Sequence, residues 1–352
     1  MKKVFLLLAA ASFAVMACNK PVYDDNTEKK PEEPEENTDP ATPENPETPE
    51  EKTDIPAAPK AGELVIEEIY YSGTLIPGAE NASDDQYIKL TNVSDHTVYA
   101  DRVLFVMNYI MGDKTDVGAY YEYPELEDGL AVNDMYLIPG KGTDHAVKPG
   151  ESVVLALAAL DYKESRTEGE GEDEKTVEGN PDALDLSGAD FEFYDENDYY
   201  PDTDNPDVEN LEIWFKSSFT ITTLHHSGLQ SYAIALVPEG ETAQKIMAER
   251  HWTGTYYFHF DEYNFDYAID DDDVWVIPGE WVLDAVNCSA EDSYFRNPWG
   301  AAFDAGYAWT VKVYNDIAHF GKSVRRKVID GKLADTNNST NDFEASVPSL
   351  KK

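Results

Sequence analysis

Basic residues are scarce in this sequence of 352 residues. Lysine and arginine together number 27, against 70 aspartates and glutamates, so the formal net charge is −43. A surface this acidic repels phosphate backbones, which argues against binding to nucleic acid. It also argues against peripheral attachment to anionic lipid.

Cysteine is scarcer still, with only Cys18 and Cys288. Two cysteines cannot build a zinc cluster or a disulfide framework. Cys288 follows an expected strand end and is predicted to pack as a small hydrophobic side chain.

Motifs of catalytic sites are missing as well. The sequence contains no Gly-x-Ser-x-Gly elbow, no Walker loop and no Gly-x-Gly-x-x-Gly fingerprint. Acidic residues are so numerous that no pair stands out for glycoside cleavage. We therefore expect a protein that is not an enzyme; the alternative is a hydrolase of unfamiliar type.

The N-terminus carries an export signal. Lys2 and Lys3 precede the apolar run Val4–Ala11, which is too short to span a bilayer. The end of the signal, Val15-Met16-Ala17-Cys18, resembles the lipobox of bacterial lipoproteins. The resemblance implies cleavage after residues 1–17 and acylation of Cys18. The alternative is ordinary signal cleavage beside an incidental cysteine.

Residues 18–60 are predicted to form a disordered acidic tether behind the lipidated cysteine. Nine of the 42 residues in Asn19–Lys60 are proline and 13 are acidic, so extended polyproline II is favoured. Tyr23-Asp24-Asp25 resembles the acidic surface-export signals of Bacteroidota lipoproteins. The resemblance implies a lipid anchor in the outer membrane with the body facing the cell exterior, although these aspartates also suit a plain acidic linker.

Residues 61–352 are predicted to form a β-rich body. Hydrophobic residues make up 41% of the whole chain, enough for a packed core, and short alternating or β-branched runs lie between turn residues. One short helix is expected at Ala243–Arg250. Strands are expected at Leu64–Tyr71, Gln86–Asn92, Thr97–Ala100, Val103–Met107, Glu151–Ala158, Leu211–Phe215, Tyr232–Val237, Val274–Ile277, Trp281–Val286 and Trp309–Val313. Many short strands separated by turns are typical of an all-β sandwich.

The order of several segments resembles a lamin-tail domain, and the set is similar to an uncharacterised Bacteroidota lipoprotein family built on a lamin-tail-like module. The segments that carry the resemblance are Leu64–Ile69, Asp85–Asn92, Val98–Asp101, Lys148–Val154, Trp281–Val286, Gly321–Arg326 and Asp335–Phe343. It implies an immunoglobulin-like β-sandwich. Lys89 departs from the pattern, which usually has an acidic residue there. Glu68 is a candidate partner for Arg325 or Arg326, which would join the first and last strands.

Three long loop insertions, at 108–134, 163–210 and 250–273, are where binding is expected, because loops on a rigid scaffold usually carry function. The second insertion has 18 acidic and 3 basic residues, and its first half is predicted to be mobile. The third insertion offers aromatic platforms for sugar rings or partner side chains, although the same residues also suit a core. Its candidate ligand-binding residues are Trp252, Tyr256, Tyr257, His259 and Tyr263.

Metal binding is a further hypothesis. Clustered oxygen ligands of the second insertion suit calcium, although solvated acidic loops explain the same pattern. The candidate calcium ligands are Asp195, Asp198, Asp202, Asp204 and Asp207. Heme or an iron chelate is a weaker hypothesis, since His225 and His226 would point to opposite faces of a strand. No cofactor is implied with certainty.

These observations favour a non-catalytic recognition module on the cell surface. Lipoproteins of the family it resembles commonly accompany TonB-dependent transporters, which implies an accessory of an outer-membrane nutrient or metal uptake system. The alternative is a structural or adhesive surface protein that binds other proteins or matrix.

Overall fold

The computed structural model describes residues 54–108, 119–122, 126, 128–168, 174–196, 200, 202–252, 255–260, 263–270, 273–292, 294, 299–313 and 315–350. All of them belong to one structural unit, Thr53–Lys352. The expected signal peptide, Cys18 and most of the expected tether lie outside the described residues.

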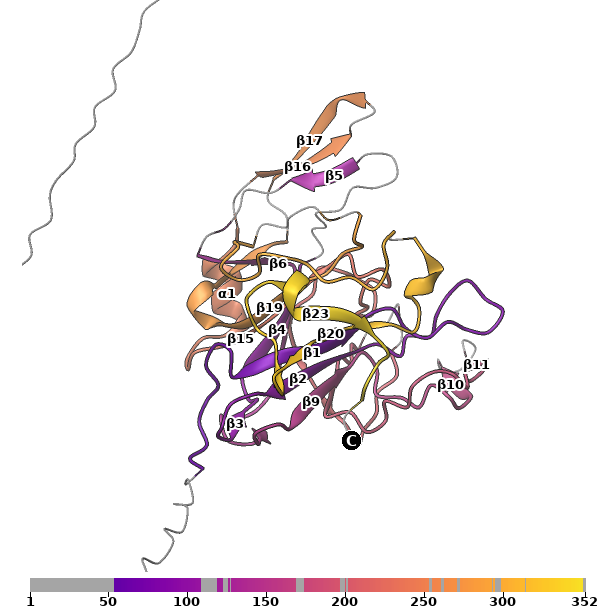
Figure 1. The fold of residues 1–352 in the computed structure, drawn as a ribbon, viewed down its shortest axis with the longest axis horizontal. Coiled ribbons are helices and arrows are strands. Elements are labelled where there is room, and N and C mark those ends of the chain that lie inside the picture. Colours follow the sequence, from indigo (N-terminus) through magenta and orange to yellow (C-terminus); the bar gives the residue numbers. More distant parts are fainter. Residues whose placement is uncertain are drawn as a thin grey trace, which may run out of the picture. The chain divides into compact units, whose positions relative to one another are not determined.

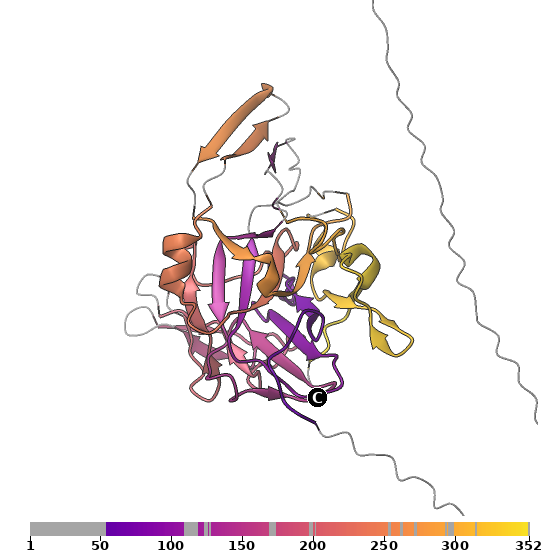
Figure 2. The same cartoon turned by 90° about the vertical axis from the view of Figure 1, so that its left-hand side faces the viewer.

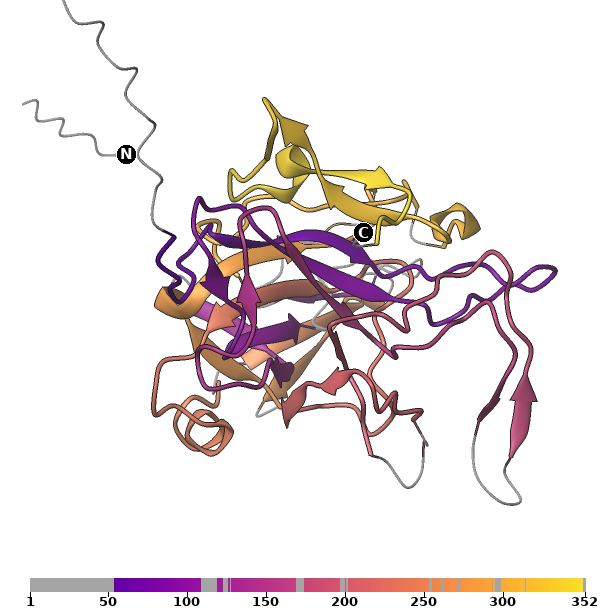
Figure 3. The ribbon, with the colours of Figure 1, turned by 90° about the horizontal axis from the view of Figure 1, so that it is seen from below.

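The larger of two main sheets contains the first and the last strands of the unit. Its order is β13 (Glu209–Asn210), β12 (Phe191–Glu192), β9 (Ser152–Ala156), β2 (Tyr87–Asn92), β1 (Leu64–Tyr70), β20 (Ser323–Arg326) and β23 (Phe343–Ser346). β12 runs parallel to β9 and β13, and the other neighbours are antiparallel. In Figure 3 the C-terminal strands (yellow) lie beside the N-terminal ones (indigo).

The second main sheet has five antiparallel strands. Its order is β14 (Glu212–Phe215), β7 (Asp134–Leu137), β4 (Val103–Asn108), β15 (Ser231–Leu236) and β19 (Val282–Asn287). Figure 2 shows α1 (Ala243–Glu249) beside this sheet, where Ile246 packs with Val106 and Ala233. Thr242 caps α1 by accepting a hydrogen bond from the Lys245 amide.

Smaller elements complete the described part of the chain. β17 (Phe265–Asp270), β16 (Thr255–Phe260) and β5 (Ala119–Glu122) form a sheet of their own (Figure 1). The two-stranded ladders are β10 (Arg166–Glu168) with β11 (Lys175–Val177), β18 (Trp275–Pro278) with β6 (Gly129–Val132), β21 (Val328–Ile329) with β22 (Lys332–Leu333), and β3 (Val98–Tyr99) with β8 (Ala146–Val147). The short helices are α2 (Ser339–Asp342), η3 (Gly279–Trp281) and η4 (Ile317–His319).

The two main sheets share one hydrophobic core, and their central strands are buried on both faces. In β9, Leu155 points into the shared core, whereas Val154 packs on the opposite face with Tyr162. In β4, Phe105 faces the shared core and Val106 faces α1. Burial on both faces explains why these strands are continuous apolar runs. Cys288 is buried in the shared core, as predicted.

A buried ion pair joins the C-terminal strands to both sheets. Arg326 on β20 donates from Nη2 to both carboxylate oxygens of Asp284 on β19, each at 2.6 Å. Its Nε donates to the Ile66 carbonyl of β1 at 2.8 Å, and the Ile66 amide donates to Asp284 at 2.7 Å. Burial opposes the charge of Arg326, but the carboxylates of Asp284 and its neighbours raise the pKa of Arg326 on balance.

Two further buried carboxylates secure the same region. Asp304 accepts hydrogen bonds from the amides of Asn287, Gly306 and Ser339 at 2.7–2.9 Å and from the Ser339 hydroxyl at 2.5 Å. Glu68 on β1 accepts from the Ser323 hydroxyl at 2.5 Å. We call Glu68, Asp284, Asp304 and Arg326 the terminal seam, because they tie the last strands to the first.

Of the two arginines expected as partners of Glu68, Arg325 lies opposite it, whereas Arg326 pairs with another carboxylate. β1 and β20 do pair, with Glu68 opposite Arg325, but the bidentate partner of Arg326 is Asp284.

Lys89, which departs from the lamin-tail pattern, has two polar partners. Its Nζ donates to Glu67 at 3.1 Å and to the Ser349 carbonyl at 3.4 Å. A cation at this position therefore connects β2 to a bulge in β1 and to the C-terminal segment.

The structure confirms a predominantly β protein with the expected helix. Trp309–Val313 was predicted as a strand, which is wrong: the carbonyls of Val311 and Lys312 accept from the amides of Glu291 and Asp292 in a loop. Residues 54–60, placed in the tether from sequence, contact β3 and the residue before it: Tyr99 donates from its amide to the Ala57 carbonyl, and Thr97 donates from its amide to Asp54 at 2.7 Å. Each expected insertion contains strands where it is described, so none is simply a loop.

Candidate ligand-binding pocket

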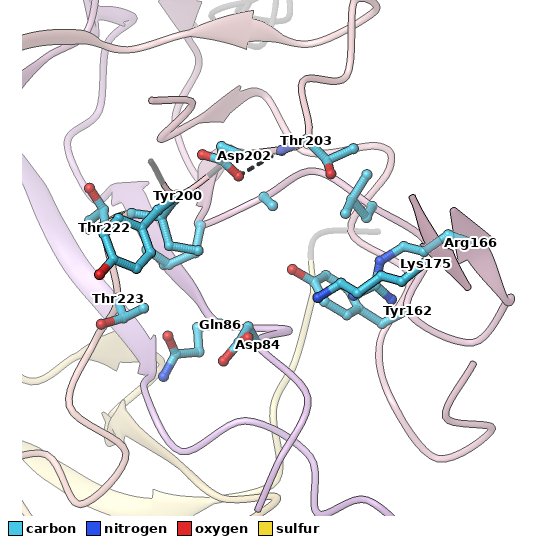
Figure 4. A pocket seen from close by; sticks show the side chains of 14 residues that line it. Asp84, Gln86, Tyr162, Arg166, Lys175, Tyr200, Asp202, Thr203, Thr222 and Thr223 are labelled. Carbon is cyan, nitrogen blue, oxygen red and sulfur yellow. Dashed lines mark hydrogen bonds between the residues drawn. The ribbon is translucent and has the colours of Figure 1, made fainter. Parts of the chain in front are cut away.

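A pocket lies where the second insertion folds against the ends of β2 and β9. Its volume is about 360 Å³. Its lining residues come from four parts of the chain (Figure 4), namely Asp84, Gln86, Leu157, Ala158, Leu160, Tyr162, Arg166, Lys175, Tyr200, Asp202, Thr203, Ile221, Thr222 and Thr223. Most of the labelled side chains are polar or charged.

Gln86 fixes one wall of the pocket. It is fully buried, and its amide nitrogen donates to the carbonyl of Tyr71 and, at 2.9 Å, to that of Leu224. Its amide oxygen accepts from the Leu224 amide at 3.1 Å. Nearby, the Thr222 hydroxyl lies 2.7 Å from the Tyr136 hydroxyl. These contacts hold residues 221–224 in place beside the cavity, so their hydroxyl groups are positioned by the core.

A second wall carries two cations. Arg166 and Lys175 lie on the hairpin of β10 and β11, in which Arg166 is opposite Val177 and Glu168 is opposite Lys175. The Arg166 guanidinium stacks over the Tyr162 ring, 4.9 Å from its centroid. Burial raises the pKa of Tyr162, and the Asp84 carboxylate raises it further. Tyr162 is therefore a neutral hydrogen-bonding group at ordinary pH.

The pocket also contains two carboxylates. Asp202 accepts from the Asp195 amide at 3.0 Å and from the Thr203 amide at 2.8 Å. Burial raises the pKa of Asp202, although these hydrogen bonds oppose the shift. Asp84 lies 3.8 Å from Nε2 of His226. Both carboxylates are acceptors suited to donors on a bound molecule.

Tyr200 forms one edge of the cavity, and its ring packs with that of Phe219. The rings of Tyr200 and Phe219 lie 5.6 Å apart, and their side chains are 43% and 74% exposed. In Figure 4, Tyr200, Thr222 and Thr223 stand across the cavity from Tyr162, Arg166 and Lys175. The pocket thus offers charge on one side and an aromatic face with hydroxyl groups on the other, which is an arrangement for binding a polar solute.

The aromatic residues predicted to bind ligand do not form one surface. Trp252 is buried with Ala131 and Val274, which is the core alternative considered for these aromatics. Tyr257, Tyr263 and His259 belong to the β16–β17 region, where Tyr257 and Tyr263 are 42% and 71% exposed. The Tyr256 side chain lies outside the described part of the structure.

Polar neighbours contact His259, His225 and His226. Nδ1 of His259 lies 2.5 Å from Asp266 on β17. His225 and His226 lie at a turn rather than on a strand, and Nδ1 of His226 is 2.8 Å from the Ser72 carbonyl. Burial lowers the pKa of His225 to about 4, with help from His226 and His319, so His225 is neutral at ordinary pH.

Three of the five candidate calcium ligands, Asp195, Asp202 and Asp204, have hydrogen-bond or ion-pair partners within the protein. Asp195 forms an ion pair with Lys216, and Asp204 accepts from the Asn210 side chain at 2.9 Å. Asp207 is exposed, and Asp198 lies outside the described residues. Among the residues that the structure describes, no group of three or more His, Cys, Asp or Glu side chains is arranged to hold a metal ion. Calcium binding therefore stays a prediction.

Sequence reasoning missed Arg166, Lys175 and Tyr162 as pocket residues. A signal for them was present, because Arg166 and Lys175 are two of only three basic residues in an insertion with 18 acidic ones. The first half of this insertion is predicted to be mobile. Its described residues 163–168 and 174–175 include β10 and the start of β11, and residues 169–173 lie outside the described part of the chain.

None of the helices described is long and apolar enough to cross a membrane.

The chain is similar to a protein family and to a solved structure. A family model described as "Protein of unknown function (DUF4876)" matches residues 148–349. A solved structure of a DUF4876 family protein from Bacteroides thetaiotaomicron VPI-5482 is similar, with a TM-score of 0.57 and 23% sequence identity. The match covers 83% of this chain and 73% of that chain, and at this identity it shows the fold alone. No curated protein matches the sequence.

Proposed function

This chain belongs to the DUF4876 family, and from that premise we propose that it is a non-catalytic surface lipoprotein whose β-rich body recognises a small solute. The observation that carries the proposal is the pocket of about 360 Å³, with its charged and hydroxyl-bearing walls. Small-molecule sites are concave and carry a few positioned polar groups, and this cavity has both properties.

The proposed location rests on the N-terminal sequence. Val15-Met16-Ala17-Cys18 supports lipidation of Cys18, and several acyl chains on one residue would anchor the protein stably. The acidic, proline-rich residues that follow would hold the body away from the bilayer. Tyr23-Asp24-Asp25 supports display on the outer face of the outer membrane.

The proposed fold is an immunoglobulin-like, lamin-tail-like β-sandwich. Support comes from the shared core between the two main sheets, into which β1, β2 and β9 on one side and β4 and β15 on the other contribute side chains. Pairing of β20 with β1 agrees with the order of segments that carries the lamin-tail resemblance. Folds of this kind host recognition more often than chemistry, but the fold alone does not define function.

The proposed partner is a TonB-dependent transporter in the outer membrane, which the solute-binding body would serve as an uptake accessory. To test this, the tagged, lipidated chain is purified from detergent-solubilised outer membranes, and co-eluting proteins are identified by mass spectrometry. The control is the Cys18→Ser variant, which cannot be lipidated. A stoichiometric transporter with the wild type alone supports the proposal, and a preparation without a membrane partner contradicts it.

A structural or adhesive role is the second candidate, favoured by one observation. Tyr263, Phe265 and Tyr267, in and just before β17, are 71%, 53% and 57% exposed. Exposed aromatic residues are common in protein interfaces. Binding to host or matrix proteins that is lost in a Phe265→Ser/Tyr267→Ser variant, with no membrane partner found, would favour this role.

A further inference from the structure

We propose that the pocket binds a sugar acid, a polyhydroxylated ring with one carboxylate; this inference rests on the proposed recognition function. The carboxylate would face Arg166 and Lys175, and the ring would lie toward Tyr200. Three features of the cavity favour such a ligand: the placement of its charges, the hydroxyl groups on the opposite side and the aromatic edge.

Two basic side chains of an otherwise acidic insertion line the cavity. The insertion 163–210 has a net charge of −15, and a field of this sign repels anions unless cations are positioned locally. Two of its three basic residues, Arg166 and Lys175, nevertheless line the same cavity. The guanidinium of Arg166 is also oriented, because it stacks over the Tyr162 ring at 4.9 Å. Arginine offers a planar set of donors that matches a carboxylate.

The two carboxylates limit how much negative charge a ligand can carry. Asp84 and Asp202 line the cavity with the cations, so the formal charges balance and a phosphate dianion would be disfavoured. Asp202 already accepts two backbone amides, and neutral hydroxyl donors can share its remaining lone pairs. A ligand with one carboxylate and several hydroxyl groups satisfies both kinds of wall.

The opposite side of the cavity suits a sugar ring. Thr222 is held by the Tyr136 hydroxyl at 2.7 Å, and Thr223 adds a further hydroxyl group. Tyr200 presents an aromatic face that is 43% exposed and is supported by the Phe219 ring. A flat apolar face beside fixed hydroxyl groups matches a ring with one apolar side and a polar rim.

The test uses the full chain in detergent and isothermal titration calorimetry. The probes are D-glucuronate, D-glucose, which has the same ring without the carboxylate, and D-glucosamine, which is cationic. Glucuronate should bind at least ~10-fold more tightly than the other two, because a hydrogen bond to a charged group is worth that factor or more. Arg166→Ala and Lys175→Ala should each weaken glucuronate binding by ~10- to 100-fold.

Lys163→Ala is the matched control, since Lys163 is the third basic residue of the insertion and is exposed outside the cavity. It should leave glucuronate binding unchanged, and near-ultraviolet circular dichroism should show that all three variants are folded. Equal binding of glucose, equal loss in Lys163→Ala, or no glucuronate binding overturns the inference. If glucose or glucosamine binds instead, the recognition function stands without the acid; if no probe binds and no membrane partner co-purifies, the proposed function fails as well.

Discussion

The terminal seam and the pocket both bring an arginine close to carboxylates, but they use charge in opposite ways. In the seam, Arg326 and Asp284 are 3% and 7% exposed and are hydrogen-bonded to each other and to backbone groups. In the pocket, Arg166 is half-buried and Lys175 is exposed at the cavity. Buried charges must be satisfied inside the protein, so they fix topology, whereas charges beside a cavity can meet a ligand.

The largest effect is expected from breaking the seam pair. Arg326→Met leaves the Asp284 carboxylate buried without its bidentate partner and should lower the free energy of unfolding by about 3–5 kcal/mol. Urea unfolding followed by circular dichroism measures this change. The double variant Arg326→Met/Asp284→Leu should recover part of the loss, because it removes both charges together. A single variant as stable as the wild type would contradict the structural role of the pair.

The second-largest effect is a dependence of stability on pH through the buried carboxyl group of Asp304. Burial raises the pKa of Asp304 to about 6 from 3.8, with its hydrogen bonds opposing the shift. The folded chain therefore holds this proton more tightly than the unfolded chain between these values. Stability from this group is fully present below pH 3.8 and is lost as the pH rises through 6, by up to about 3 kcal/mol.

Other buried carboxyls act in the same direction, because burial also raises the pKa values of Glu68, Asp85, Glu192 and Asp202. His225 acts in the opposite direction, because its pKa is lowered to about 4 and the folded chain therefore gains stability as the pH rises toward 6.5. The effect of Asp304 is isolated by urea unfolding of the wild type and of the Asp304→Asn variant at intervals from pH 4 to pH 7. Relative to the variant, the wild type should lose free energy of unfolding as the pH rises, since the variant lacks the titrating carboxyl group. An equal slope in both proteins would mean that Asp304 does not titrate in this range.

A smaller effect is expected at Cys288, next to the seam. Its thiol is buried in the shared core, and burial raises its pKa well above 9.0, with Asp304 adding to the shift. Cys288→Ser should cost about 1–2 kcal/mol by burying a hydroxyl group, and Cys288→Ala about 1 kcal/mol. A thiol reagent at pH 8 should label Cys288 only after unfolding. Rapid labelling of the folded chain would contradict its burial.

The smallest effect on stability is expected at the pocket. Arg166→Ala loses a partly exposed stacking contact with Tyr162 and should cost about 0.5–1 kcal/mol. Lys175→Ala should cost less, because Lys175 is exposed. Thermal unfolding of both variants beside Lys163→Ala measures the difference. A loss as large as that of Arg326→Met would mean that the pocket charges are structural, like those of the seam.

The strands of the two main sheets could be predicted where local pattern reflects burial. Val103–Met107 and Tyr232–Val237 correspond to β4 and β15, and Ala243–Arg250 to α1. β12 and β13 escaped prediction because they are two residues long, lie among acidic residues and pair in parallel with distant partners. Trp309–Val313 shows the converse, since it has an alternating pattern but its carbonyls accept from a loop.

The pocket could not be predicted, because its walls meet only through long-range contacts. Gln86 and Leu224 are 138 residues apart in sequence and join through hydrogen bonds on both sides of the Gln86 amide. Local pattern also could not separate Trp252, which is buried, from Tyr263, which is 71% exposed. An excess of acidic residues likewise drew attention to carboxylates as metal ligands, whereas the informative residues in that insertion are its few cations.

The pairing of β1 with β20 has a consequence for when the protein can fold. Glu68 and Ser323, which join these strands, are separated by 255 residues, so the larger sheet closes only after nearly the whole chain is present. A chain that emerges from its N-terminal end keeps one side of β1 unpaired until β20 arrives. Such late closure slows folding and exposes a strand edge to other chains. The unpaired edge of β1 therefore has to be kept from pairing with other chains until β20 has been synthesised.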